Sequence, residues 1–229
     1  MAKRPPAANP ALDADTAVGL LKKLSTKHDF SNLKRFGIVS NKAFGVSMAN
    51  IQKVAKPLGR NHALAEALWK TGWYEARMLA SLVDEPEKVT RAQMDRWCKD
   101  FDNWGICDTV CFTLFDRTPH AFAKVTKWSA SKEEFVKRGA FALLASLALH
   151  DKRSADAAFL KTLPLIERAA TDDRNFVKKG VSWALRGIGH RSPKLWAGAM
   201  ALAGRLAESE DTTARWIGRD ALKDLKRLA

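Results

Sequence analysis

A tryptophan and an aspartate four positions apart, Trp104 and Asp108, are the residues of this chain whose types and spacing best suit chemistry. In a helix they lie on one face, one turn apart, and we expect that face to carry no other large apolar group. Cys107 and Cys111 fall on the adjacent core side. An aromatic ring beside a carboxylate can hold a sugar ring or a cation. The alternative is a half-buried tryptophan beside a solvated aspartate.

A second group combines an aromatic ring with two cations. Lys179, Trp183 and Arg186 stand at positions i, i+4 and i+7 of a helix expected over residues 173–189. This interleaving of basic and aromatic side chains is typical of contacts to a sugar–phosphate backbone. The alternative is that Trp183 covers the core while the aliphatic stems of the cations extend to solvent.

The elements that must position these residues repeat along the chain. The phrase Phe-Val-Lys-Arg at 135–138 returns as Phe-Val-Lys-Lys at 176–179, 41 residues later, and a weaker copy lies at 216–219. A helical period of about 40 indicates stacked helix pairs of the HEAT or armadillo type. Stacking would align the basic residue that ends each phrase on one surface. The residues so aligned are Arg138, with Lys137 beside it, Lys179 and Arg219.

Apolar residues recur at helical spacing throughout, and nothing indicates a series of strands. We therefore expect an all-α fold, a HEAT-like helical-repeat solenoid of about six helix pairs with a concave basic face. Capping boxes are expected at Ser131 with Glu134 and at Thr90 with Gln93. Residues 1–12 are expected to be disordered and 13–229 to form one domain. The expected helices are 13–27, 48–57, 61–70, 73–83, 90–100, 104–115, 119–128, 132–150, 154–170, 173–189, 193–207 and 211–227.

Composition narrows the class of partner. The chain has 229 residues and a net charge of +14, which favours a polyanion such as nucleic acid. No run of 18 apolar residues and no signal peptide is evident, so we expect a cytoplasmic protein that does not span a membrane. An anionic membrane surface is the weaker alternative, because no basic amphipathic helix stands apart from the repeats. The three cysteines are interpreted as core thiols, and no metal site is expected. The tryptophans other than Trp104 and Trp183 are interpreted as packing between repeats.

Three segments in order resemble the DNA alkylation repair family of helical-repeat DNA glycosylases, the alkylpurine glycosylase D-like proteins. The segments are Asp102-Asn103-Trp104-Gly105-Ile106-Cys107-Asp108, Phe135-Val136-Lys137-Arg138-Gly139-Ala140 and Phe176-Val177-Lys178-Lys179-Gly180-Val181-Ser182-Trp183-Ala184-Leu185-Arg186. The resemblance covers roughly residues 30–227. It implies a concave surface that wraps duplex DNA and excises cationic alkylated bases, chiefly N3-methyladenine and N7-methylguanine.

The resemblance also implies roles for single residues. Trp104 and Trp183 would pack against the deoxyribose of the damaged nucleotide, and Asp108 would sit near the anomeric carbon. Arg138 would hold a backbone phosphate, with Lys137, Lys179 and Arg186 as further DNA contacts. Two positions depart from the family. Phe36 stands where the family can hold Tyr, and Ser47 stands at a Gln-like position, changes that could alter lesion range or DNA grip.

The expected reaction is hydrolysis of an N-glycosidic bond by a monofunctional DNA glycosylase. An N-alkylated purine already carries a positive charge and leaves without a strong general acid, so the enzyme has to stabilise an oxocarbenium-like sugar. One carboxylate and two aromatic faces can do this, and no cofactor is expected. The expected partner is double-stranded DNA with alkylated bases, bound by a monomer. The alternative is a non-catalytic HEAT-type module that binds nucleic acid or an acidic protein surface, for which Asp108 would be unfavourable because it repels phosphate.

Overall fold

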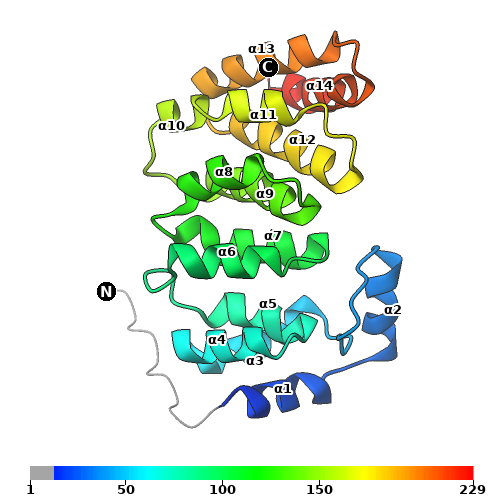
Figure 1. The fold of residues 1–229 in the computed structure, drawn as a ribbon, viewed down its shortest axis with the longest axis vertical. Helices are drawn as coiled ribbons and strands as arrows, with labels where there is room; N and C mark the ends of the chain where they lie inside the picture. Colours follow the sequence, from blue (N-terminus) through cyan, green and yellow to red (C-terminus); the bar gives the residue numbers. More distant parts are fainter. Residues whose placement is uncertain (1–12, 229) are drawn as a thin grey trace. The chain divides into compact units, whose positions relative to one another are not determined.

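The computed structural model describes residues 13–228, and the segment expected to be disordered, residues 1–12, lies outside the described residues. Over that range the chain forms α-helices and two short 3-10 helices with no strand, which confirms the all-α prediction (Figure 1). None of the described helices has the length and apolar character needed to cross a membrane. The fold divides after Leu114 into two compact units, and the prediction of one domain over 13–229 stays a prediction.

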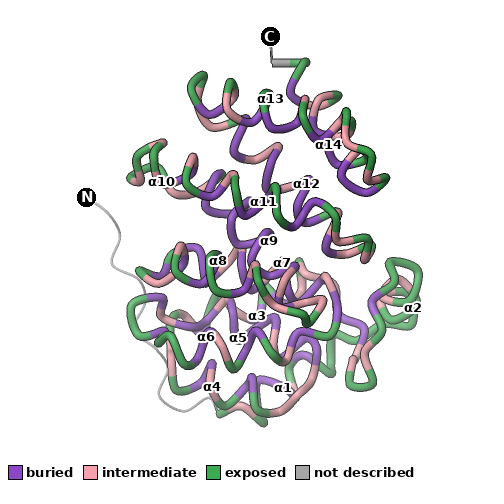
Figure 2. Tube along the Cα trace, turned by 45° about the horizontal axis from the view of Figure 1, so that its top comes forward, coloured by how far each residue is buried: buried purple, intermediate pink, exposed green. Residues whose placement is uncertain are grey.

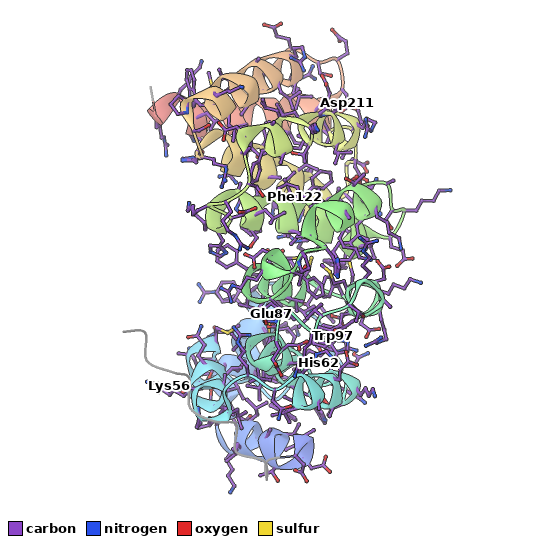
Figure 3. All side chains as sticks on the ribbon, turned by 90° about the vertical axis from the view of Figure 1, so that its left-hand side faces the viewer. Lys56, His62, Glu87, Trp97, Phe122 and Asp211 are labelled. Atoms are coloured by element: carbon purple, nitrogen blue, oxygen red, sulfur yellow. The ribbon has the colours of Figure 1, made fainter. Side chains whose placement is uncertain are left out.

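The N-terminal unit, which ends at Leu114, has a core built largely from aromatic and aliphatic side chains of α4 to α7. Trp97, labelled in Figure 3, is fully buried, and its ring stacks on that of Trp69 with centroids 3.9 Å apart. Cys98, Cys107 and Cys111 are buried free thiols, as predicted. The helices are α1 (Ala14–Lys23), α2 (Lys27–Arg35), α3 (Met48–Leu58), α4 (His62–Lys70), α5 (Tyr74–Val83), α6 (Arg91–Lys99) and α7 (Trp104–Thr113).

Helix α2 was not predicted. The expected helix 13–27 ends at Lys23, and Thr26 then caps a new helix by accepting a hydrogen bond from the Asp29 amide at 2.9 Å. Its sequence is mostly polar and buries no residue, so the apolar periodicity that marks the other helices is missing. Figures 1 and 2 show α2 standing apart from the other helices of its unit.

The C-terminal unit, which begins at Phe115, stacks helix pairs in two layers. The unit consists of η1 (Phe115–Arg117), α8 (Ala121–Ser129), α9 (Glu134–His150), α10 (Asp156–Leu160), α11 (Leu163–Ala169), α12 (Asn175–Gly189), α13 (Pro193–Ala207), α14 (Thr212–Leu225) and η2 (Lys226–Leu228). Helices α9, α12 and α14 pack in succession in one layer, while α11 contacts α8 and α13 in the other. Figure 2 shows α9 buried along most of its length.

The sequence repeat corresponds to this stacking. Phe135 of α9 and Phe176 of α12 begin the two copies of the repeated phrase, and their ring centroids lie 5.4 Å apart. The predicted register of the repeat is therefore confirmed at this pair of helices.

Three local predictions were wrong in detail. The helix expected over 154–170 is interrupted between α10 and α11, and Pro164 lies in the first turn of α11, where its missing N–H breaks no helical hydrogen bond. Ser131 does not cap α9: the N-cap is Glu133, whose amide donates to the Ser131 hydroxyl. Thr90 does cap α6 by accepting from the Gln93 amide at 3.1 Å, but the Gln93 side chain donates to Asp84 and does not complete the predicted capping box.

One glycine sets how closely α13 and α14 approach. A Cβ added at Gly218 of α14 would lie 2.2 Å from the Ala207 nitrogen and 2.6 Å from the Ala203 carbonyl oxygen. Both atoms belong to the backbone and cannot move aside as a side chain can. The close packing of the last helix pair therefore requires glycine at this position.

Gly218→Ala is expected to push α14 away from α13 and to lower the free energy of unfolding by about 1–3 kcal/mol. Gly204→Ala in α13 is the matched control, because nothing lies within 4 Å of a Cβ added there. That change should raise the free energy of unfolding by up to about 1 kcal/mol, since alanine has a higher helix propensity than glycine. Urea unfolding of both variants measures the difference, and equal midpoints would contradict the close-packing argument.

Candidate functional site

Trp104, the first residue of α7, is held by a contact distant in sequence. Asn103 caps the helix by accepting from the Ile106 amide at 3.0 Å. The Trp104 indole nitrogen then donates a hydrogen bond to the carbonyl oxygen of Phe36 at 2.9 Å. The half-buried ring is thus fixed at one edge by the backbone that ends α2. No sequence pattern predicted this link between α7 and the α2–α3 segment.

The backbone under Trp104 is closely packed. A Cβ added at Gly105 would lie 2.6 Å from the Tyr74 hydroxyl and 3.0 Å from a methyl of Ile38. Tyr74 is buried, and burial, followed by the nearby charges of Glu75 and Asp102, raises the pKa of its phenol. The hydroxyl therefore stays protonated at neutral pH. These contacts fix the direction in which α7 begins.

Glu75 anchors the segment that carries Phe36. This carboxylate is completely buried in α5 and accepts hydrogen bonds from the amides of Phe44, Gly45 and Val46 at 2.7–3.3 Å. Gly45 has φ +80°, and a Cβ there would lie 2.5 Å from the Phe30 nitrogen. The Phe44 ring also stacks on Trp73 with centroids 4.2 Å apart. A glutamate in a helix of mostly apolar residues was the available sequence signal for this anchor.

Glu75→Gln is expected to lower the free energy of unfolding by about 3 kcal/mol, because an amide group replaces a buried acceptor of charge-assisted hydrogen bonds. Amide hydrogen exchange at Phe44–Val46 should accelerate more than the loss of global stability alone would cause. Glu66→Gln is the matched control, since Glu66 pairs with the exposed Arg96 at 2.7 Å, and such pairs contribute about 1 kcal/mol or less. Equal effects of the two changes would rule out the anchoring role.

Asp108 lies one turn after Trp104 and is half-buried. Phe112 follows one further turn along α7 and is also half-buried, so the expectation that this face carries no other large apolar group was wrong. Asp108 therefore stands between two aromatic residues on its helix face, in a partly desolvated setting. Such a setting strengthens the interaction of a carboxylate with a cation.

Phe36 and Ser47 flank the anchored segment. Phe36 is 58% exposed at the end of α2, with the Arg35 guanidinium 5.9 Å from its ring centroid. Ser47 is the N-cap of α3 and accepts from the Asn50 amide at 3.4 Å. Ser47 thus has a structural role in starting α3, and the DNA contacts predicted for both residues stay predictions.

In the C-terminal unit, Lys179, Trp183 and Arg186 form a stripe along α12. Lys179 is exposed, whereas Trp183 and Arg186 are half-buried. The Arg186 guanidinium lies 3.6 Å from Asp220 and 4.0 Å from Asp224 of α14. These carboxylates offset its charge, so Lys179 is the cation of this stripe that faces solvent most openly.

Arg138 occupies a different environment from the one its place in the repeat indicated. It is only 7% exposed, and its guanidinium donates a hydrogen bond to the Phe176 carbonyl oxygen at 2.7 Å. Arg138 therefore joins α9 to α12, while Lys179 and Arg219 at the corresponding positions are exposed.

Lys137 is part of an ion-pair cluster. Its ammonium lies 2.8 Å from the Asp172 carboxylate, which also receives the Arg174 guanidinium at 2.6 Å. Arg174, followed by Lys137, holds the pKa of Asp172 well below its usual range. The cluster fixes the segment before α12 to the start of α9.

The model of the family described as DNA alkylation repair enzyme matches residues 19–225, nearly the whole chain. The chain belongs to the DNA alkylation repair enzyme family. No curated protein matches significantly.

The solved structures add a likeness of fold. One is described as "A new family of proteins related to the HEAT-like repeat DNA glycosylases with affinity for branched DNA structures"; it has a TM-score of 0.79 and 20% identity, and the match covers 94% of this chain and 95% of that chain. It confirms the predicted HEAT-like fold. A designed armadillo repeat protein, at 13% identity over 95% of this chain and 96% of its own, has a TM-score of 0.38.

Proposed function

We propose that this protein is a monofunctional DNA glycosylase that hydrolyses the N-glycosidic bond of cationic alkylated purines in duplex DNA. Membership of the DNA alkylation repair enzyme family supports this proposal. The observation that carries it is the half-buried carboxylate of Asp108, one turn from a tryptophan whose indole is held in place by Phe36. A protein that only bound phosphates would gain nothing from this carboxylate.

The proposed reaction needs little from the protein. N3-methyladenine and N7-methylguanine are cationic in DNA and depart as neutral bases, so no strong general acid is required. Positive charge then develops on the deoxyribose. Asp108 stabilises that charge electrostatically and orients the attacking water, while the ring of Trp104 contacts the sugar. Trp183 of the C-terminal unit is proposed separately as an aromatic contact to the DNA.

The remaining site residues are proposed to hold the DNA. Lys179 contacts a phosphate directly from its exposed position on α12. Arg138, whose guanidinium donates to the Phe176 carbonyl oxygen, is proposed to place its positive charge near a backbone phosphate. Lys137 and Arg186 contribute positive charge despite their carboxylate partners. Phe36 and Ser47 are proposed to flank the duplex beside α2.

A non-catalytic role in binding branched DNA is the second candidate. It is favoured by the likeness in fold to a protein with affinity for such structures. The two candidates differ in what they require of Asp108, because only base release needs its negative charge.

Asp108→Asn is expected to lower base release by at least about 100-fold, since removing one electrostatic group from such a site typically costs about that much. Binding to undamaged duplex should be nearly unchanged. The measurement is single-turnover release of N7-methylguanine from a duplex oligonucleotide. Asp102→Asn is the control, because Asp102 is an exposed aspartate just before the same helix.

Undiminished release by the Asp108→Asn protein would show that the proposed mechanism is wrong. If neither the wild type nor this variant released base while both bound duplex, the protein would be a DNA-binding module.

Lys179→Ala is expected to weaken duplex binding and to reduce by about one the slope of the logarithm of affinity against the logarithm of salt concentration. Lys194→Ala, an exposed lysine of α13 in the other layer, should leave that slope unchanged. Arg138→Ala should also weaken binding, and it should lower the melting temperature because the bond to Phe176 is lost. A Lys179→Ala slope equal to that of wild type would exclude the phosphate contact.

A further inference from the structure

A hollow of about 450 Å³ lies along α14; none of the proposed glycosylase residues lines it, although Arg186 of α12 pairs with its Asp220. Its volume is within the range of pockets that hold small ligands or single nucleotides. The chain enters α14 through the N-cap Asp211, labelled in Figure 3, which accepts from the amides of Thr213 and Ala214. The lining residues are Thr212, Arg215, Trp216, Arg219, Asp220 and Lys223.

Trp216 in this hollow is more exposed than its expected packing role implies. It is 40% exposed, whereas Trp69, Trp97 and Trp128 are at most 3% exposed. The Lys178 ammonium lies 5.3 Å from the Trp216 ring centroid, a cation–π contact that orients the indole without covering it fully. An oriented, accessible indole is a surface on which another flat ring can stack.

The hollow is positively charged. Arg215, Arg219 and Lys223 follow one another at intervals of four, hence along one side of the helix. Arg219 and Lys223 are exposed and have no ionic or hydrogen-bonding partner among residues 13–228. Arg215 donates one N–H to the Ser209 carbonyl oxygen, which holds its side chain beside the ring.

The one acidic residue of the hollow is already engaged. Asp220 accepts a hydrogen bond from the Ser182 hydroxyl at 2.5 Å and lies 3.6 Å from the Arg186 guanidinium. Trp216 and Asp220 have the same spacing as Trp104 and Asp108, yet the surroundings of Asp220 offset its charge. The hollow therefore suits an anion with an aromatic group rather than a cationic sugar.

We propose that this hollow binds an unpaired nucleotide of a single-stranded DNA segment. The base stacks on Trp216, and the adjacent phosphates contact Arg219 and Lys223, with Arg215 behind them. This proposal for the hollow depends on the proposed function in one respect, which is that DNA is the partner.

An unpaired nucleotide explains the exposed indole and the row of cations better than a duplex does. Inside a duplex the faces of the bases are covered by their neighbours, so an exposed indole would find only sugar and phosphate. A cation row alone would serve any acidic surface, but an oriented ring among the cations selects a ligand that has a flat ring of its own.

The test compares two DNAs that share one duplex region, one blunt and one extended by a single-stranded thymidine tail. The wild type is expected to bind the tailed DNA about tenfold more tightly, the gain typical of one stacked base. Fluorescence anisotropy at fixed salt measures both dissociation constants. Trp216→Ala should abolish the advantage of the tail, and Trp216→Phe, which keeps a ring, should retain most of it.

A second pair of variants tests the phosphate contacts without touching the ring. Arg219→Ala combined with Lys223→Ala should reduce the advantage of the tail and its dependence on salt, whereas Lys194→Ala should not. Circular dichroism of each variant verifies folding. If Trp216→Ala unfolds the last helix pair, the double variant Arg219→Ala with Lys223→Ala still tests the proposal.

Three results would overturn the assignment. These are equal binding of blunt and tailed DNA by the wild type, a full tail advantage in Trp216→Ala, and equal loss in the alanine and phenylalanine variants, which would mark a packing role. Release of N7-methylguanine from blunt duplex is measured in parallel and should be unchanged in Trp216→Ala. If the protein bound tailed DNA more tightly than blunt DNA but released no N7-methylguanine, the proposal for the hollow would stand and the glycosylase proposal would be wrong.

Discussion

A helix pair in this chain cannot bury its own apolar face, and the need to cover that face with the next pair governs the described architecture. In the C-terminal unit this brings α9, α12 and α14 into one layer, where Phe135 meets Phe176 and Gly218 lets α14 approach α13. Side chains that face the next pair become buried, and only the remaining stripe of each helix can meet a ligand. Lys179 of α12 and Arg219 of α14 lie on such exposed strips.

The same constraint separates residues that the repeat makes equivalent. Arg138 is covered because α12 stacks on α9, and its charge is used on the Phe176 carbonyl oxygen. Lys179 and Arg219, at the corresponding places of the next two copies, extend into solvent. Equivalent positions in a repeat thus share a backbone location without sharing an environment, and only the packing of each pair decides which cation can reach a phosphate.

Much of the fold could be predicted from periodicity alone. The repeat of 41 residues correctly paired α9 with α12, and the buried thiols of α7 followed from helical spacing. Helix α2 escaped prediction because it buries nothing and so leaves no apolar period. The anchor at Glu75 and the indole contact of Trp104 also escaped it, since both join positions about 30 or more residues apart through backbone atoms of an irregular segment. Trp216 was assigned to packing because its type, without its neighbours, does not reveal exposure.

The hydrogen bond between Trp104 and Phe36 has a consequence for how such a site can diversify. The acceptor is a main-chain oxygen, so the indole is held whatever side chain stands at position 36. That side chain is 58% exposed and takes no part in the bond. Substitutions at position 36 can therefore change the surface near Trp104 while the hydrogen bond that holds the indole is kept.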